Sequence, residues 1–256
     1  MRLLKVSENM RAIRTRLGKA LVSGFSKRLA ERVEAHPLIS FTFDDFPKSA
    51  WMVGGKMLTA RKKKGTYYAC MGLMGSTSEV GSLFTLEDVQ QLCSAGHELG
   101  CHTLDHVSCH DVTAREFAEN CENNRQMAAS VLGGYSLRNL SFPFGHASFG
   151  AKRILRSRYD TCRSTESGTN IDPVDLSFLR ATPMYSRFDI DTVKRLISEN
   201  TKAKSWLILY THDVTENPSP YGCTPDYFEE ILDCALGSGA DIVTVAEAVT
   251  RFRGSA

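Results

Sequence analysis

Several features that would assign a chain to a common class of protein are missing here. No apolar run approaches the ~18 residues that a membrane-spanning helix needs. The formal net charge is only +2, which gives no overall electrostatic footprint for nucleic acid, so we expect no nucleic-acid partner. The first residues contain no apolar segment of the secretory type, and the chain has no internal repeat or low-complexity stretch. These absences favour a cytoplasmic globular protein.

The eight cysteines include no Cys-x-x-Cys pair, a spacing common in structural metal sites and redox proteins. Because there is no export signal, we expect most of them to be reduced and several to pack as small apolar side chains. Cys101 directly precedes His102, and neighbouring side chains on a strand face opposite sides. We therefore expect the Cys101 thiol to point away from any metal bound at this histidine.

Residues 1–35 are predicted to form a helical extension that precedes the main domain, residues 36–256. Apolar side chains recur every four residues at Ile13, Leu17, Leu21 and Phe25, and most charges in this segment are basic. We expect this amphipathic helix to dock on the domain, and contact with an anionic membrane surface is the alternative. Pro37 ends the segment.

From residue 38 onward, strand and helix signals alternate. Helix starts are indicated by an acidic turn after Thr85, capping boxes at Thr113 and Thr244, and caps at Asp189 and Thr224. The strand candidates are residues 38–43, 66–70, 98–101, 138–142, 159–162, 179–183, 205–210 and 241–244. This alternation predicts βα units on a parallel sheet, and about seven or eight units favour an irregular (β/α) barrel over an open sheet.

The longer connections follow strands, which places them on the rim where α/β barrels bind ligands. They carry Trp51, His146, Phe149 and Tyr221. An aromatic side chain on this rim is suited to stacking on a bound ligand, so we expect Trp51 in particular to contact substrate.

Two adjacent carboxylates, Asp44 and Asp45, end the apolar and β-branched strand of residues 38–43. Side chains alternate along a strand, so the two acids can share one site only where the strand ends and the backbone relaxes. Such a pair at a strand tip suggests that one carboxylate holds a metal and the other moves a proton.

A His-x-x-x-His pair, His102 and His106, follows the strand candidate 98–101. Two imidazoles four residues apart converge if the residues between them form one helical turn, and neutral imidazole is a good ligand for zinc and its neighbours. With one aspartate they would leave coordination positions open for water and substrate. A further histidine, His212, lies two residues after the apolar run 206–210.

These elements resemble the NodB-type polysaccharide deacetylases of carbohydrate esterase family 4. The first family motif is matched by Thr42-Phe43-Asp44-Asp45 and the second by His102-Thr103-x-x-His106. The third corresponds to the strand tip 141–145, Ser-Phe-Pro-Phe-Gly, and the late strand ending in histidine corresponds to 209–212. The matches follow the family's order and span most of residues 37–250. The resemblance implies a distorted (β/α)7 barrel.

The resemblance also implies a role for each matched residue. Asp45, His102 and His106 would bind a divalent metal, with zinc expected and cobalt, nickel or iron as alternatives. Asp44 would be the base that deprotonates water, and His212 the acid that protonates the leaving amine. The oxyanion would lie near the backbone N–H of Phe144, which follows Pro143.

Two departures from the family pattern matter. Many members carry an arginine in the third motif that orients the catalytic aspartate, but Ser141 occupies this position here. We expect Arg163, at the end of a strand candidate, to replace it, and Arg180 is the alternative. The fourth motif, an acid beside tryptophan, is not recognisable; Asp172 and Asp175 are candidates for the acid that tunes the catalytic histidine.

The sequence therefore predicts a metal-dependent hydrolase that removes N-acetyl groups from an amino sugar in an oligosaccharide or glycan precursor. One alternative is a hydrolase of the same superfamily for another linear amide, such as an N-formyl sugar or a ureide. A second is a non-catalytic glycan-binding module, which the presence of both Asp44 and His212 disfavours. A non-haem iron oxygenase could use the same ligand types, but the alternating strands and helices disagree with its usual fold.

Overall fold

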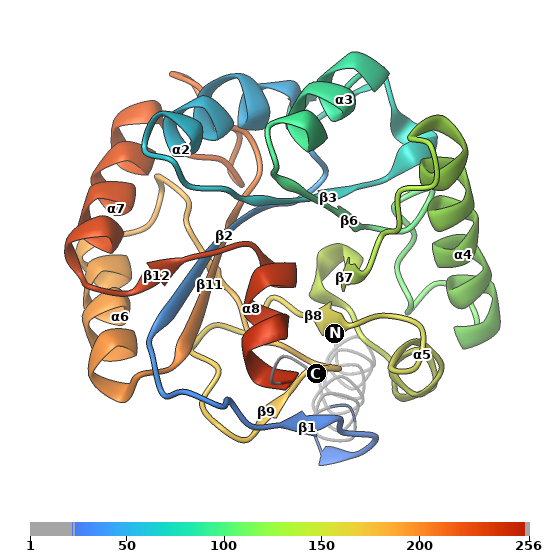
Figure 1. Ribbon diagram of the computed structural model, residues 1–256. Helices are drawn as coiled ribbons and strands as arrows, with labels where there is room; N and C mark the ends of the chain where they lie inside the picture. The colour runs from blue at the N-terminus through green and yellow to red at the C-terminus, as the bar shows by residue number, and fades with distance from the viewer. Residues whose placement is uncertain (1–21, 23, 254–256) are drawn as a thin grey trace, which may run out of the picture.

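The computed structural model describes residue 22 and residues 24–253, and it shows a curled sheet surrounded by helices (Figure 1). Seven parallel strands lie in the order β10-β11-β2-β3-β6-β7-β8, and an eighth, β12, pairs with β2. Their bounds are β2 (Leu38–Phe43), β3 (Thr66–Ala69), β6 (Glu98–Cys101), β7 (Asn139–Ser141), β8 (Thr161–Arg163), β10 (Thr182–Pro183), β11 (Trp206–Thr211) and β12 (Asp241–Ile242). The expected distorted (β/α)7-type barrel is confirmed.

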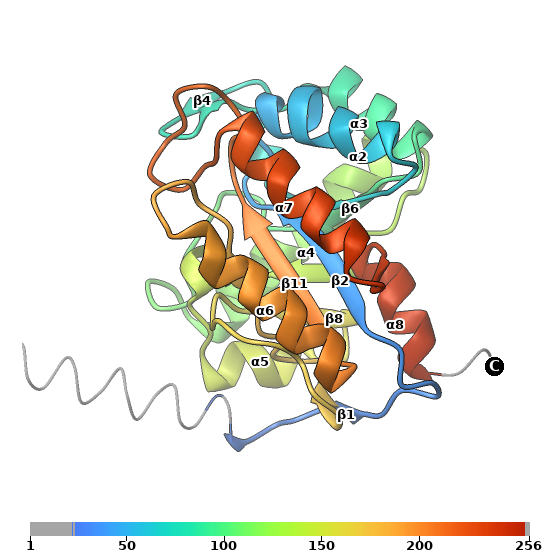
Figure 2. The same cartoon turned by 90° about the vertical axis from the view of Figure 1, so that its left-hand side faces the viewer.

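Helices follow most of the strands and cover the outer face of the sheet (Figures 1 and 2). Their bounds are α2 (Lys56–Ala60), α3 (Leu86–Ser94), α4 (Ala114–Val131), α5 (Phe149–Leu155), α6 (Ile190–Ala203), α7 (Pro225–Gly237) and α8 (Val245–Arg253). The predicted caps are present: Thr85 and Thr113 form capping boxes, and Asp189 and Thr224 accept from backbone N–H groups of α6 and α7. Local side-chain chemistry thus starts these helices where the sequence predicts.

The distortion of the barrel lies between β8 and β10. The segment that joins them contacts β8 through single backbone hydrogen bonds: Cys162 N–H donates to Leu176, and Ser164 N–H donates to Leu179 at 2.8 Å. This irregular segment replaces a full strand pairing and leaves the site-bearing end of the barrel asymmetric.

The parity of each strand decides which side chains enter the barrel. On β2, Phe41 and Phe43 point outward and pack against Phe228 of α7, with ring centroids 5.6 and 5.8 Å apart. Ser40 and Thr42 point inward, where the Ser40 hydroxyl accepts from the indole of Trp206 at 3.0 Å. The next inward position is Asp44, so the alternation that builds the core also delivers a carboxylate to the barrel mouth.

Helix α8 closes the opposite, amino end of the barrel. Val245 N–H donates to the Thr66 hydroxyl at 3.0 Å, and Ala246 N–H donates to the buried Glu98 carboxylate at 2.8 Å. Apolar side chains of α8, among them Val249 and Phe252, pack in the same cluster as Trp206. The open end of the barrel is therefore the end where the strands finish.

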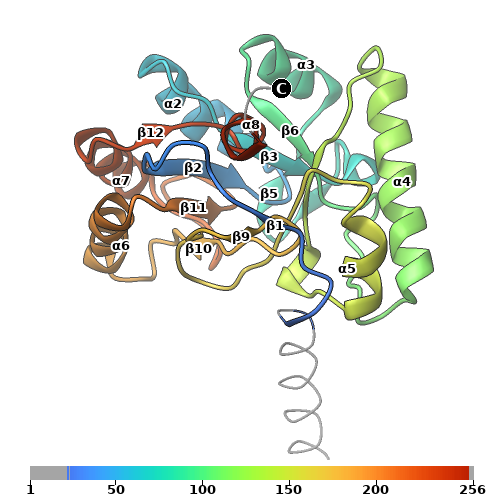
Figure 3. The same cartoon turned by 60° about the horizontal axis from the view of Figure 1, so that its bottom comes forward.

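The predicted N-terminal helix is wrong over the part that the structure describes from residue 25 onward. Leu29–Ala30 form strand β1, which pairs antiparallel with β9 (Val174–Asp175) (Figure 3). The Arg28 guanidinium donates to the carbonyls of Arg156 and Tyr159 at 2.8 and 2.9 Å. These contacts require an extended backbone, which overrides the helical spacing of apolar residues. Residues 22 and 24 are helical, and the rest of the prediction, on residues 1–21 and 23, lies outside the described residues.

Three further elements were not predicted. A π-helical segment, Ala50–Gly55, precedes α2; α5 forms where a loop was expected; and β4 (Thr77–Ser78) and β5 (Gly81–Ser82) make a short hairpin. Figure 2 shows the hairpin at the same end as the tip of β11, beside the barrel mouth. None of the described helices is long and apolar enough to cross a membrane.

Candidate metal and catalytic centre

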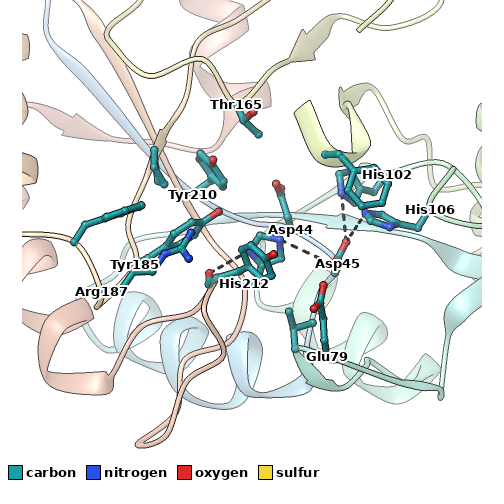
Figure 4. Close-up of a pocket in the computed structure, with 15 residues that line it drawn as sticks. Asp44, Asp45, Glu79, His102, His106, Thr165, Tyr185, Arg187, Tyr210 and His212 are labelled. Carbon is teal, nitrogen blue, oxygen red and sulfur yellow. Dashed lines mark hydrogen bonds and ion pairs between the residues drawn. The ribbon is translucent and has the colours of Figure 1, made fainter. Parts of the chain in front are cut away.

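Asp45, His102 and His106 converge at the carboxyl end of the barrel (Figure 4). Asp45 follows β2 and His102 follows β6, the two strands that flank β3 in the sheet. The Asp45 Oδ1 lies 3.2 Å from Nε2 of His106 and 3.4 Å from Nε2 of His102. The candidate ligand atoms of the three residues all lie within 4.8 Å of one another. The sequence prediction of these three side chains as one group is supported by this geometry.

The two histidines converge for a different reason from the one expected. The residues between them do not form a helical turn; instead Thr103 and His106 have φ of 65° and 55°. The side-chain oxygen of Asn120 on α4 holds the loop by accepting from the N–H groups of Leu104 and Asp105, at 2.7 and 3.2 Å. Two left-handed residues therefore turn the chain so that both imidazoles face Asp45.

Backbone strain gathers around this centre. Five non-glycine residues with positive φ belong to it or to the adjoining third motif: Asp45, Phe46, Thr103, His106 and Phe144. A left-handed conformation costs a non-glycine residue roughly 1–3 kcal/mol, so it persists only where the surroundings enforce it. Such clustering is typical of functional sites.

The donor set fits a divalent metal. Asp45 Oδ1 is buried and has no hydrogen-bond partner among the described residues. The His102 Nδ1–H donates to the Ser141 carbonyl at 2.8 Å, which leaves the Nε2 lone pair directed at the site. Metal–ligand bonds of about 2.0–2.1 Å give tetrahedral edges of about 3.3 Å, close to the two measured separations. A buried oxygen and two imidazole nitrogens at this spacing are a ligand set for a divalent metal, with an open position.

Two of the three ligands favour the metal-binding form, and His102 does not. Burial raises the pKa of Asp45, but the neighbouring His102, His212 and His106 outweigh it and hold the pKa below its ordinary value. Burial lowers the pKa of His106 to about 4. At neutral pH both groups are therefore in the deprotonated form that binds metals. Burial lowers the pKa of His102, but Asp45 and Asp44 outweigh it and raise this pKa above its ordinary value, so a bound metal would displace a proton from this imidazole.

Asp44 lies beside this group and is paired with Arg163. The Arg163 Nη2 donates directly to Asp44 Oδ1, and also to the Ser141 hydroxyl. Both members of the pair are buried, with Asp44 3% exposed and Arg163 0% exposed. The guanidinium carbon also lies 5.0 and 4.9 Å from the ring centroids of Tyr68 and Tyr210. The predicted contact between Arg163 and Asp44 is confirmed, and it lies inside the ~4 Å range of an ion pair.

The arginine comes from β8, the strand next to the one that carries Ser141. Ser141 of β7 and Arg163 of β8 are register partners, so they stand at the same height in the barrel. Burial raises the pKa of Asp44, but Arg163, His102 and His212 together lower it below its ordinary value. The alternative candidate, Arg180, is wrong: its exposed side chain donates to the Ser167 carbonyl at 3.0 Å.

His212 completes the arrangement from the tip of β11, next to β2. Its Nδ1 lies 3.1 Å from the Tyr221 carbonyl, an acceptor only, so the proton of that bond is on Nδ1. The other nitrogen, Nε2, faces the centre 3.9 Å from Asp45 Oδ2. The acids suggested as tuning groups are elsewhere: Asp172 bonds Arg32, and Asp175 bonds Lys152. A backbone carbonyl, which no sequence motif could indicate, holds this imidazole.

The site opens into a pocket of about 370 Å³. Phe144 lines it, 57% exposed, with its ring centroid 4.5 Å from that of His106, and Pro143 is buried beneath. Trp51 does not reach the pocket, so its assignment to substrate contact is wrong. The π-helical turn at Ala50–Gly55 directs its ring inward against Tyr67 and His97, and only 7% of the residue is exposed.

Several pocket residues were not predicted as site residues: Glu79, Thr165, Tyr185, Arg187 and Tyr210. The strand alternation offers one missed signal, because Tyr210 and His212 stand on the same face of β11 two residues apart. The others lie on connections whose path depends on tertiary contacts. Cys101, in contrast, behaves as expected: its thiol lies among Asn124, Tyr159 and Cys121, away from the ligand group.

The fold and the site define a (β/α) barrel protein with a candidate divalent-metal centre at the carboxyl ends of its strands. The chain belongs to the polysaccharide deacetylase family, whose family model matches residues 32–158, about half of the chain. No curated protein sequence gives a significant match.

Solved structures share the fold. The Xyl-CE4 domain of a multidomain xylanase from the hindgut metagenome of Trinervitermes trinervoides is 18% identical, with a TM-score of 0.61 over 86% of this chain and 93% of that chain. The chitin deacetylase of the fungal pathogen Colletotrichum lindemuthianum is 16% identical, with a TM-score of 0.59 over 85% and 89%. The Bc1960 peptidoglycan N-acetylglucosamine deacetylase is 15% identical, with a TM-score of 0.59 over 89% and 92%. At these identities the likeness establishes the fold.

Proposed function

We propose that this protein is a metal-dependent hydrolase that removes the N-acetyl group from an amino sugar in an oligosaccharide or glycan precursor. One observation carries the proposal: an open Asp/His/His group lies beside a buried, arginine-paired carboxylate and a histidine whose Nε2 faces that group. This arrangement supplies a metal site, a base and an acid within one pocket. Chitin and peptidoglycan N-acetylglucosamine, named for two of the similar structures, support an acetylated amino sugar as substrate.

Asp45, His102 and His106 would hold the metal, and zinc is the expected ion because it favours imidazole and carboxylate ligands with an open position. When bound, it would polarise the N-acetyl carbonyl and lower the pKa of an adjacent water. Two contacts hold the ligands in position. The Ser141 carbonyl accepts from His102, and the Asn120 side-chain oxygen accepts from the loop between His102 and His106.

Asp44 takes the proton of the attacking water, because Arg163 keeps its carboxylate ionised and fixes its orientation. His212 gives its Nε2–H proton to the leaving amine. Its Nδ1–H remains on the Tyr221 carbonyl, so the ring does not rotate while the proton moves. The products are acetate and the free amino sugar.

The developing oxyanion needs a donor besides the metal, and the backbone N–H of Phe144 is the candidate. The left-handed backbone at Phe144, with φ of 59°, turns the chain at this point beside His106. The exposed Phe144 ring offers an apolar face to a sugar ring above the ligand group.

The test is a screen of acetate and formate release from defined sugars by protein reconstituted with zinc, cobalt, nickel or iron(II). Acetate release that requires a metal and an N-acetylated sugar is the expected outcome. Formate release from N-formyl sugars, without acetate release from N-acetyl sugars, would replace deacetylation by deformylation. Saturable glycan binding without any release, in protein shown to hold its metal, would indicate a binding module instead.

A further inference from the structure

Arg187 lies in the pocket at the end away from the metal ligands. In Figure 4 the side chains run from His102 and His106 through Asp45 and His212 to Arg187. A sugar whose acetamide reaches the ligand group and whose nitrogen reaches His212 therefore extends toward Arg187. This arginine is the only lysine or arginine among the described residues that line the pocket.

Three aromatic rings hold the Arg187 side chain in position. Its guanidinium carbon lies 5.4 Å from the ring centroid of Tyr185, 5.0 Å from that of Phe188 and 5.5 Å from that of Tyr221. Such contacts between a guanidinium and aromatic rings leave N–H donors of the guanidinium available to other partners. Tyr221 also accepts from His212 through its carbonyl, so one residue positions both the acid and the arginine.

The backbone that carries Arg187 is itself fixed to the loop after His212. Ser186 N–H donates to the Gly222 carbonyl at 3.1 Å, and the Ser186 hydroxyl accepts from Thr224 N–H at 2.7 Å. Gly222 also packs closely on Asp213, because a Cβ there would lie 2.4 Å from an Asp213 carboxylate oxygen. Arg187 is therefore presented by a braced segment, although its side chain is exposed.

The charge of Arg187 has no acidic partner among the described residues. No carboxylate of this part of the chain lies within the 4.0 Å limit that defines the other ion pairs, such as Arg180 with Glu166. The other charged side chains lining the pocket are Asp44, Asp45 and Glu79, all acidic. An arginine without an acidic partner, at the end of the pocket away from the ligand group, is suited to an anionic group on the substrate.

We propose that Arg187 selects substrates in which the N-acetylated sugar carries, or is joined to a unit that carries, an oxyanion such as a phosphate or a carboxylate. This inference rests on the proposed deacetylase function and narrows its substrate class. The aromatic support keeps the guanidinium edge directed into the pocket, where it pairs with the oxyanion on the amino-sugar side of the scissile bond.

The test compares matched substrates that differ in charge. N-acetylglucosamine 1-phosphate is paired with methyl N-acetylglucosaminide, and glucuronosyl-N-acetylglucosamine with glucosyl-N-acetylglucosamine. For each pair, the ratio of kcat/KM for the anionic over the neutral substrate is measured by acetate release from the metal-reconstituted enzyme. We expect the wild-type ratio to exceed 1 for at least one pair, and that pair identifies the anion as phosphate or carboxylate.

Arg187→Met keeps much of the apolar stem and removes the charge, and we expect it to lower that ratio by about tenfold or more. Arg187→Lys should restore part of the preference, since the lysine ammonium keeps the positive charge but lacks the paired N–H donors of the guanidinium. The matched control is Arg195→Met, which removes an exposed arginine of α6 outside the pocket and should keep the wild-type ratio and activity.

A wild-type ratio near or below 1 for both pairs would overturn the proposal, even if acetate is released efficiently. So would an unchanged ratio in Arg187→Met, including the case in which that variant loses activity on charged and neutral substrates alike. If no sugar releases acetate, the proposed deacetylase function fails. The neutral substrates distinguish this case, because their turnover does not depend on the anion that Arg187 is proposed to bind.

Discussion

Replacement of Arg163 should be the most informative single perturbation of this protein. Arg163→Met removes the cation and leaves Asp44 buried, 3% exposed, without a charged partner. Loss of one member of a buried ion pair typically costs about 3–5 kcal/mol, because the remaining charge stays out of water. For a chain of this size, about 2–4 °C per kcal/mol corresponds to a fall in Tm of roughly 6–20 °C.

The assay is a double-mutant cycle on unfolding free energy, measured by urea denaturation of metal-free protein so that metal binding does not contribute. Asp44→Asn also destabilises, since Arg163 then has no counter-charge, whereas the double variant leaves no lone buried charge. We expect the double variant to lose less than the sum of the single losses, by at least about 1.5 kcal/mol. Additivity of the two losses within about 0.5 kcal/mol would refute the assignment of this pair.

Activity gives a second readout of the same contact. Arg163→Met should lower kcat/KM roughly 10–100-fold in folded, metal-loaded enzyme, as expected for loss of a hydrogen bond to a charged group. Arg163→Lys should recover part of it. The control is Arg180→Met, which removes an exposed arginine that does not contact Asp44 and should change stability by no more than about 0.5 kcal/mol.

Three further predictions concern the centre and the core. His102→Ala or His106→Ala should lose stoichiometric metal and activity together, and full occupancy by elemental analysis in either variant would contradict its role as a ligand. Asp44→Asn and His212→Ala should retain the metal while kcat falls by roughly 10²–10⁴, and near-normal turnover would require another base or acid. Burial lowers the pKa of His97 from 6.5 to about 4, so the unfolded chain takes up a proton in this range before the folded chain does. Unfolding free energy should therefore fall, by at most about 3 kcal/mol, as the pH drops from 6.5 to 4; His97→Asn should flatten this slope, and an unchanged slope would show that another group is responsible.

Much of the fold and the centre could be predicted because both follow from strand alternation. Every second residue of a strand faces the inside of the barrel. On β2 these inward positions end in Asp44, and on β6 they run through Gly100 to His102. On β8 the inward positions end in Arg163, which is why a buried arginine could be expected to reach the mouth of the barrel. Helix caps were equally accessible, since each depends on residues within one turn of the chain.

The errors lie where long-range contacts decide the conformation. Trp51 was expected on the rim because of its loop position, but an unforeseen π-helical turn packs it against the core. The apolar spacing through Phe25 predicted a helix, whereas Arg28 finds its carbonyl partners more than a hundred residues later in the chain. The carbonyl behind His212 belongs to backbone nine residues on, and no side-chain pattern records it.

The pairing of Ser141 with Arg163 across neighbouring strands changes how the absence of a family arginine should be judged. The two positions share one level of the barrel, so they belong to a single ring of inward side chains that also holds Asp44 within reach. In the proposed mechanism a cation on that ring keeps Asp44 ionised, and in this chain β8 rather than β7 provides it. A chain that has serine at the expected position therefore retains its active-site charge when an arginine stands opposite on the next strand. Comparing relatives level by level around the barrel, rather than motif by motif along the sequence, would separate such relocated sites from those that have been lost.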